Sequence, residues 1–69
     1  MEQQDFERIA LAALRELGVP KGEMTIAPTA GKPGHWDINI QGRQSLKIRC
    51  GQGSSPQWVR EQIFDQYNQ

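Results

Sequence analysis

Two short stretches of alternating polarity, residues 35–41 and 44–50, constrain the fold of this chain most strongly. Apolar and polar side chains take turns along each stretch, so an extended chain places the two kinds on opposite faces. The apolar positions are Trp36, Ile38, Ile40, Leu46, Ile48 and Cys50. Because only two residues separate the stretches, the pattern predicts an antiparallel hairpin with one face on a core and the other in water.

The apolar faces also predict the register of this hairpin. Core-facing residues must oppose one another, which gives three pairs: Ile40 with Leu46, Ile38 with Ile48, and Trp36 with Cys50. This register needs a loop of about three or five residues around residues 42–44. On the polar face it places Asp37 opposite Arg49, an exposed ion pair worth about 0.2–1 kcal/mol. Trp36 and Cys50 are therefore expected to be core residues.

Residues 5–17 carry apolar side chains every three or four positions, which predicts an amphipathic helix. The apolar stripe consists of Phe6, Ile9, Ala10, Ala13, Leu14 and Leu17. Asp5 is the predicted N-cap, because its carboxylate can accept a hydrogen bond from a backbone N–H of the first turn. Gly18 fits the left-handed residue that follows a helix, and Pro20 prevents its continuation.

A further extended stretch and a second helix complete the predicted elements. Residues 23–28 predict a strand, and residues 28–34 predict a loop, because they contain two Gly and two Pro. Ser55 as N-cap and Pro56 at the first helical position predict a second helix. Its apolar stripe consists of Val59, Ile63 and Tyr67, flanked by Phe64. The order α-β-β-β-α predicts an α+β fold with both helices packed on one face of a three-stranded antiparallel sheet.

Length and composition narrow the functional classes. We expect residues 1–69 to form a single domain, and no apolar run is long enough to cross a membrane. The single cysteine and the absence of an export signal predict a reducing, cytoplasmic setting. No paired carboxylates, nucleophile–base motif or metal-ligand spacing occurs in the sequence. We therefore expect no enzymatic activity, no cofactor and no metal site.

The charges cancel overall but are unevenly spread. Eight basic and eight acidic residues give a net charge of zero, which argues against a generic polyanion binder. Residues 20–60, however, hold six basic and two acidic side chains, a net charge of +4. Residues 1–19 and 61–69 carry −2 each. The centre of the chain is therefore basic enough to contact an anionic partner.

Two loop segments carry a resemblance to a known family. Residues 31–35 read Gly-Lys-Pro-Gly-His, and residues 51–60 read Gly-Gln-Gly-Ser-Ser-Pro-Gln-Trp-Val-Arg. Together with the α-β-β-β-α order, these segments resemble the double-stranded RNA-binding domain. In that family a Gly-Pro-x-His-like loop joins the first two strands, and a Gly-x-Gly-x-Ser-Lys-Lys-x-Ala-Lys-like run opens the second helix. Here Arg60 matches the last basic position, whereas Pro56 and Gln57 replace the two lysines.

The resemblance implies shape-dependent binding to duplex RNA. The implied nucleic-acid contacts are Lys32, His35, Ser54, Ser55, Gln57 and Arg60. The loss of two lysines removes about two phosphate contacts, so the expected affinity is low. The family does not use the polar face of its sheet for RNA, so the resemblance leaves Lys47 and Arg49 out of the interface.

Other interpretations of these features stay open. The loop at residues 51–55 is also compatible with an ordinary turn, and His35 with a plain surface group. Trp58 lies opposite the apolar stripe of its helix and is expected to be exposed, either as a lid over the preceding loop or as a contact for a partner. A protein-interaction or dimerisation module that has lost RNA binding is therefore the alternative function. The alternative fold is a small DNA-binding module of βββα type with an additional N-terminal helix.

Overall fold

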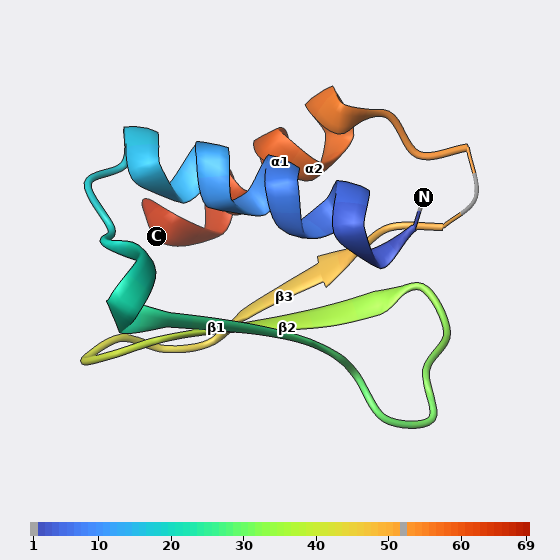
Figure 1. The fold of residues 1–69 in the computed structure, drawn as a ribbon, viewed down its shortest axis with the longest axis horizontal. Coiled ribbons are helices and arrows are strands. Elements are labelled where there is room, and N and C mark those ends of the chain that lie inside the picture. Colours follow the sequence, from blue (N-terminus) through green and yellow to red (C-terminus); the bar gives the residue numbers. More distant parts are fainter. Residues whose placement is uncertain (1, 52) are drawn as a thin grey trace.

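A sheet covered on one face by two helices forms the structure of this chain (Figure 1). The computed structural model describes residues 2–51 and 53–69. Its elements are α1 (Gln3–Glu16), a turn of 3₁₀ helix (Lys21–Glu23), β1 (Met24–Pro28), β2 (His35–Ile40), β3 (Leu46–Arg49) and α2 (Pro56–Tyr67). The sheet has the order β1-β2-β3, and both neighbouring pairs are antiparallel. The predicted α+β fold is thereby confirmed.

Both ends of α1 follow from local backbone chemistry. The helix begins at Gln3 with Glu2 as its N-cap, so the prediction that Asp5 caps it is wrong. Asp5 lies inside the first turn, where its negative charge interacts favourably with the helix dipole. At the other end, the N–H of Val19 donates to the Leu14 carbonyl at 2.9 Å. This bond closes a Schellman motif around Gly18, whose φ of 87° is the predicted left-handed conformation.

The predicted start of α2, with Ser55 as N-cap and Pro56 at the first helical position, is confirmed. The Ser55 hydroxyl oxygen accepts a hydrogen bond from the backbone N–H of Trp58 at 3.2 Å. Pro56 occupies the first helical position, where the missing N–H costs nothing. The cap therefore fixes the direction in which α2 leaves the preceding loop.

The predicted register of β2 and β3 is wrong by two residues. Trp36 pairs with Ile48 and Ile38 with Leu46, while Asp37 lies opposite Lys47 and not opposite Arg49. A shift of two residues keeps every side chain on its face, so the hydrophobic pattern is equally satisfied by both registers. The turn decides between them, because the Arg43 N–H donates to the Ile40 carbonyl at 3.0 Å and reverses the chain early.

The core lies between the sheet and the two helices. Its buried apolar residues are Phe6, Ala10, Ala13, Leu14, Val19, Trp36, Ile38, Ile40, Leu46, Ile48, Cys50, Val59 and Ile63. The rings of Phe6 and Trp36 stack with their centroids 4.5 Å apart, which joins α1 to the middle strand. The expectation that Trp36 and Cys50 are core residues is confirmed.

The two edges of the sheet differ in how their backbone groups are used. The Thr29 N–H donates to the His35 carbonyl, and the Gln41 N–H donates to the Glu23 carbonyl, so odd-numbered residues direct their backbone groups toward β2. The even-numbered residues of β1 therefore direct their backbone N–H and carbonyl groups away from β2. Pro28 has no N–H, and the N–H of Met24 is bonded within the preceding 3₁₀ turn. Ile26 is therefore the residue of β1 whose N–H is directed outward. The edge of β3 is covered by side chains of α2, as described below.

Candidate functional site

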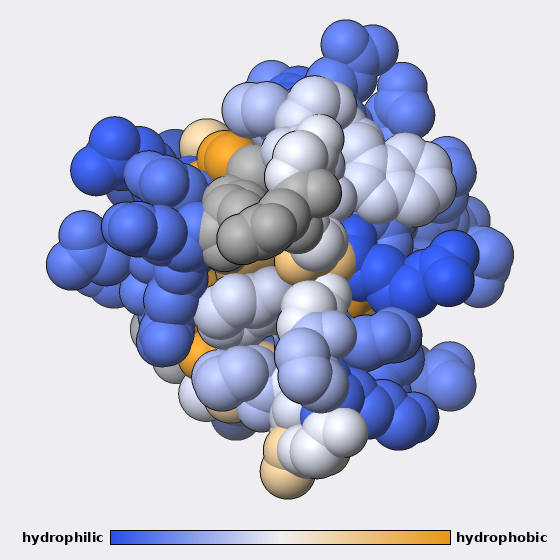
Figure 2. Space-filling model, turned by 90° about the vertical axis from the view of Figure 1, so that its right-hand side faces the viewer, coloured by the Kyte–Doolittle hydropathy of each residue, from blue (hydrophilic) through white to orange (hydrophobic). Residues whose placement is uncertain are grey.

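The two loops singled out by the sequence lie at the same end of the molecule. The β1–β2 loop and the β3–α2 loop both occupy the right-hand end in Figure 1, and Figure 2 views that end directly. The loops touch, because the N–H of Cys50 donates to the Gly34 carbonyl at 2.6 Å. Gly34 has a φ of 80°, and a Cβ there would lie 3.4 Å from the Cys50 carbonyl oxygen. The contact therefore favours glycine at this position.

The hydroxyl oxygens of the two predicted serine contacts are used inside their own loop. The Ser54 oxygen accepts from the Gly51 N–H at 3.0 Å, and the Ser55 oxygen caps α2. Each hydroxyl keeps its proton for a further partner, since these bonds use only oxygen lone pairs. The serines thus shape the start of α2 and still present donors at its surface.

The two predicted contacts on α2 are engaged in other interactions. The Gln57 amide donates to the Glu61 carboxylate at 3.2 Å. Arg60 forms an ion pair with Glu16 at the far end of α1 and lies over the Phe64 ring at 5.1 Å. This hydrogen bond lowers the pKa of Glu16 and raises the pKa of Arg60. The charge of Arg60 is therefore balanced within the molecule.

Lys32 and His35 face the outer side of the sheet. They line a cavity of about 230 Å³ together with Thr29, Asp37 and Lys47. Asp37 accepts a hydrogen bond from the Lys47 ammonium at 2.7 Å. This bond, helped by a hydrogen bond from Thr29 and by the charge of Lys32, holds the pKa of Asp37 below its usual value. The structure thus groups Lys32 and His35 with Lys47 rather than with Arg60.

Charge is separated between the two layers of the fold. Residues 2–16 and 56–67, the helices with the N-cap of α1, hold six acidic and three basic side chains, a net charge of −3. Residues 21–51, the sheet with its loops, hold five basic and two acidic side chains, a net charge of +3. The net charge of zero is therefore the sum of an acidic helix layer and a basic sheet layer.

Sequence reasoning missed the part that Lys47 and Arg49 play in this basic layer. The alternating pattern places both residues on the polar face with His35, and this shared face was the sequence feature that could have indicated their role. The family resemblance led to their exclusion, because it placed the interface elsewhere. In the structure Arg49 lies directly opposite His35, and Lys47 lies opposite Asp37.

Trp58 is the one large apolar side chain that is exposed within the described residues, with 43% of its surface accessible. The predicted exposure is therefore confirmed. The ring projects from the first turns of α2, beside the cap made by Ser55. It belongs to α2 and hence to the acidic helix layer.

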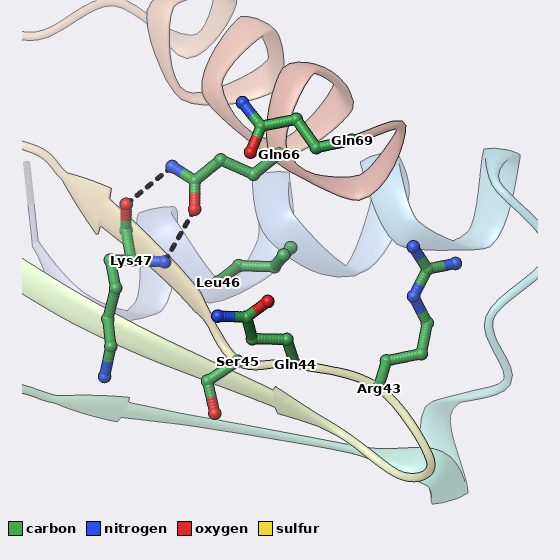
Figure 3. Close-up of a pocket in the computed structure, with 7 residues that line it drawn as sticks. All are labelled: Arg43, Gln44, Ser45, Leu46, Lys47, Gln66 and Gln69. Carbon is green, nitrogen blue, oxygen red and sulfur yellow. Dashed lines mark hydrogen bonds between the residues drawn. The ribbon is translucent and has the colours of Figure 1, made fainter.

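Two glutamines of α2 bind the outer edge of β3. Gln66 accepts from the Lys47 N–H at 2.8 Å and donates to the Lys47 carbonyl at 2.7 Å, as the dashed lines in Figure 3 show. Gln62 makes the same pair of bonds to Arg49, at 2.9 and 2.7 Å. Each side chain thus replaces one residue of a neighbouring strand. These four bonds fix the backbone from which Lys47 and Arg49 project.

A polar cavity of about 290 Å³ lies beside these bonds, between the β2–β3 loop and the end of α2 (Figure 3). Arg43 closes one side of it. Its guanidinium donates to the Tyr67 carbonyl at 2.5 Å and lies 3.8 Å from the centroid of the Tyr67 ring. The residue therefore ties the hairpin loop to α2.

Comparisons with protein-family models, curated proteins and solved structures return no match for this chain. Neither helix in residues 2–51 and 53–69 is long and apolar enough to cross a membrane. Over the same residues, no three His, Cys, Asp or Glu side chains are grouped closely enough to hold a metal ion.

Proposed function

We propose that this chain is a small nucleic-acid-binding module that binds duplex RNA weakly and by shape. The observation that carries this proposal is the contact between its two candidate loops, made by the Cys50–Gly34 hydrogen bond of 2.6 Å. This contact gathers residues 31–35 and 53–57 at one end of the domain. The α-β-β-β-α order and the capped start of α2 support the same reading.

The internal interactions of the site explain why the binding is weak. Arg60 is paired with Glu16, and Gln57 is bonded to Glu61, so both must exchange a partner before they reach a phosphate. Lys32 is then the remaining charged group of the proposed surface, with the His35 imidazole beside it. A protein with so few phosphate contacts has a shallow salt dependence, with a slope of about −0.9 in log K against log salt for each contact.

Amide shifts in a titration with duplex RNA test this proposal. A labelled sample at low salt receives an RNA duplex of about 16–20 base pairs, the length that this shape-dependent mode spans. We expect shifts in segments 31–35 and 53–60, independent of base sequence and weakened by salt. A DNA duplex of the same sequence is the control, because it lacks the 2′-hydroxyls. The proposal fails if neither segment shifts with RNA.

A protein-interaction module is the second candidate function, and the exposure of Trp58 favours it. Tryptophan is enriched among residues that dominate protein interfaces. The Trp58→Ala variant is expected to lose self-association in sedimentation experiments while its circular dichroism spectrum is unchanged. Gln57→Ala, an exposed neighbour on α2, is the matched control. A wild-type chain that stays monomeric at millimolar concentration contradicts self-association.

A further inference from the structure

We propose that the outer face of the sheet holds a site for a phosphate group, formed by Lys32, His35 and Arg49 beside the Asp37–Lys47 ion pair. The ligand class is a small phosphate-bearing anion such as a diphosphate. This site shares Lys32 and His35 with the proposed RNA surface but does not include the start of α2, and it does not require that duplex RNA binds there.

The strand register brings two of the site residues together. His35 and Arg49 are direct partners across β2 and β3, and their side chains share the outer face. Partners of this kind have Cβ atoms about 4.5–5.5 Å apart. Lys32 lies on the turn that leads into β2, where its carbonyl accepts from the His35 N–H at 3.1 Å. Lys32 and His35 therefore line one cavity, and Arg49 lies outside that lining as the cross-strand neighbour of His35.

The charges in this area are only partly balanced. Asp37 is committed to Lys47 by the bond of 2.7 Å. The side chains of Lys32, His35 and Arg49 make no hydrogen bond or ion pair with the part of the chain that the structure describes. The net charge of +3 in the sheet layer adds an attraction for an anion.

The cavity beside these residues has a size that suits such a ligand. Its volume of about 230 Å³ equals the space of about seven or eight water molecules at about 30 Å³ each. A phosphate or diphosphate group fits in this space, whereas a duplex does not enter it. The Thr29 hydroxyl also lies in the lining, where it donates to Asp37 and helps to hold that carboxylate beside Lys47.

Inorganic pyrophosphate is the probe for the first experiment. Amide shifts of the labelled full chain are followed at low ionic strength. We expect saturable shifts at His35, Lys47 and Arg49 and none in residues 53–60. Shifts that never saturate, or that appear equally all over the basic layer, overturn the proposal.

Variants that each remove one positive charge distinguish a specific phosphate site from non-specific electrostatic attraction of the anion. Arg49→Gln and Lys32→Gln are each expected to weaken pyrophosphate binding about tenfold, since a charge-assisted hydrogen bond is worth about one factor of ten. Lys21→Gln removes the same charge from the groove beside α1 and β1 and should change the affinity less than about twofold. Equal weakening by Lys21→Gln and Arg49→Gln overturns the proposal.

Asp37→Asn gives a change in the opposite direction. It removes the negative charge nearest the site and releases Lys47, so we expect pyrophosphate to bind more tightly. Unchanged or weaker binding overturns the proposal. The variant should fold, because the pair is exposed on the Lys47 side and its atoms lie outside the core.

The RNA titration distinguishes the two possible sources of the phosphate. If Arg49→Gln also weakens RNA binding, the site accepts a phosphodiester of the nucleic acid. If only pyrophosphate depends on Arg49, the ligand is a small molecule. RNA shifts in residues 53–60 without any pyrophosphate effect at residues 35–49 leave the proposed function standing and reject this site. Pyrophosphate effects at residues 35–49 without RNA shifts support this site and reject the proposed function.

Discussion

The glutamine pair that binds the edge of β3 should contribute strongly to stability. Gln62 and Gln66 make four hydrogen bonds to the backbone of Arg49 and Lys47. A net hydrogen bond contributes about 0.5–1.5 kcal/mol, and the lower end applies because both strand residues are exposed to water. Each glutamine is therefore worth about 1 kcal/mol and the pair about 2 kcal/mol. A chain of this length has about 3–10 kcal/mol in total, so the loss is large.

Urea unfolding of Gln62→Ala/Gln66→Ala measures this contribution. With a slope of about 1 kcal/mol per molar urea, the midpoint should fall by about 2 M. Gln57→Ala is the matched control, because Gln57 lies on the same helix and bonds only to Glu61. The control corrects for the higher helix propensity of alanine. Amide exchange at Lys47 and Arg49 should also accelerate in the double variant.

Gln66→Glu sharpens the test, since it keeps the shape and removes the donor. A carboxylate oxygen then faces the Lys47 carbonyl, so we expect a loss at pH 7 at least as large as that of Gln66→Ala. Protonation below about pH 4 should restore part of the stability. The reasoning is refuted if the double alanine variant loses no more than the Gln57→Ala control.

Three further predictions follow from single contacts. Gly34→Ala should destabilise the fold by about 1–2 kcal/mol in urea, because its φ of 80° disfavours a side chain, whereas Ala30→Gly in the same loop should have a smaller effect. Ser55→Ala should cost about 1 kcal/mol through loss of the helix cap, seen as a lower Tm. The lowered pKa of Asp37 means that its pair with Lys47 stabilises the fold above the unfolded pKa of about 3.8, and this contribution is lost as the pH falls further. Wild type and Asp37→Asn should therefore differ in stability at pH 7 and converge at low pH; a constant difference contradicts this.

The alternating and helical patterns predicted all five main elements, because each reports which face of a segment is buried. They predicted that β2 pairs with β3 but gave a register that is wrong by two residues. A shift by two residues leaves Trp36 and Ile38 facing the core, so burial alone cannot distinguish the registers. The turn closed by Arg43 and Ile40 decides the register, and its geometry is a property of the backbone rather than of polarity.

The sequence predicted which segments form the candidate site, but not which of their side chains are bound by other parts of the chain. Exposure of Trp58 and capping by Ser55 follow from helical periodicity and local sequence. The pairing of Arg60 with Glu16 joins residues on different helices, and no local pattern indicates it. The bonds of Gln62 and Gln66 depend likewise on how α2 lies along β3. Such long-range contacts decide which of the predicted side chains remain available to a ligand.

The protected edges of the sheet restrict how copies of this chain can associate. The backbone of β3 is already bonded by α2, and β1 offers an outward N–H at Ile26 between Pro28 and a closed turn. A second molecule that extends the sheet therefore finds both outward N–H groups of β3 already bonded and one outward N–H on β1, which limits the edge pairing through which strands propagate into fibres. Side chains are the other means of association, and within the described residues Trp58 is the exposed large apolar side chain.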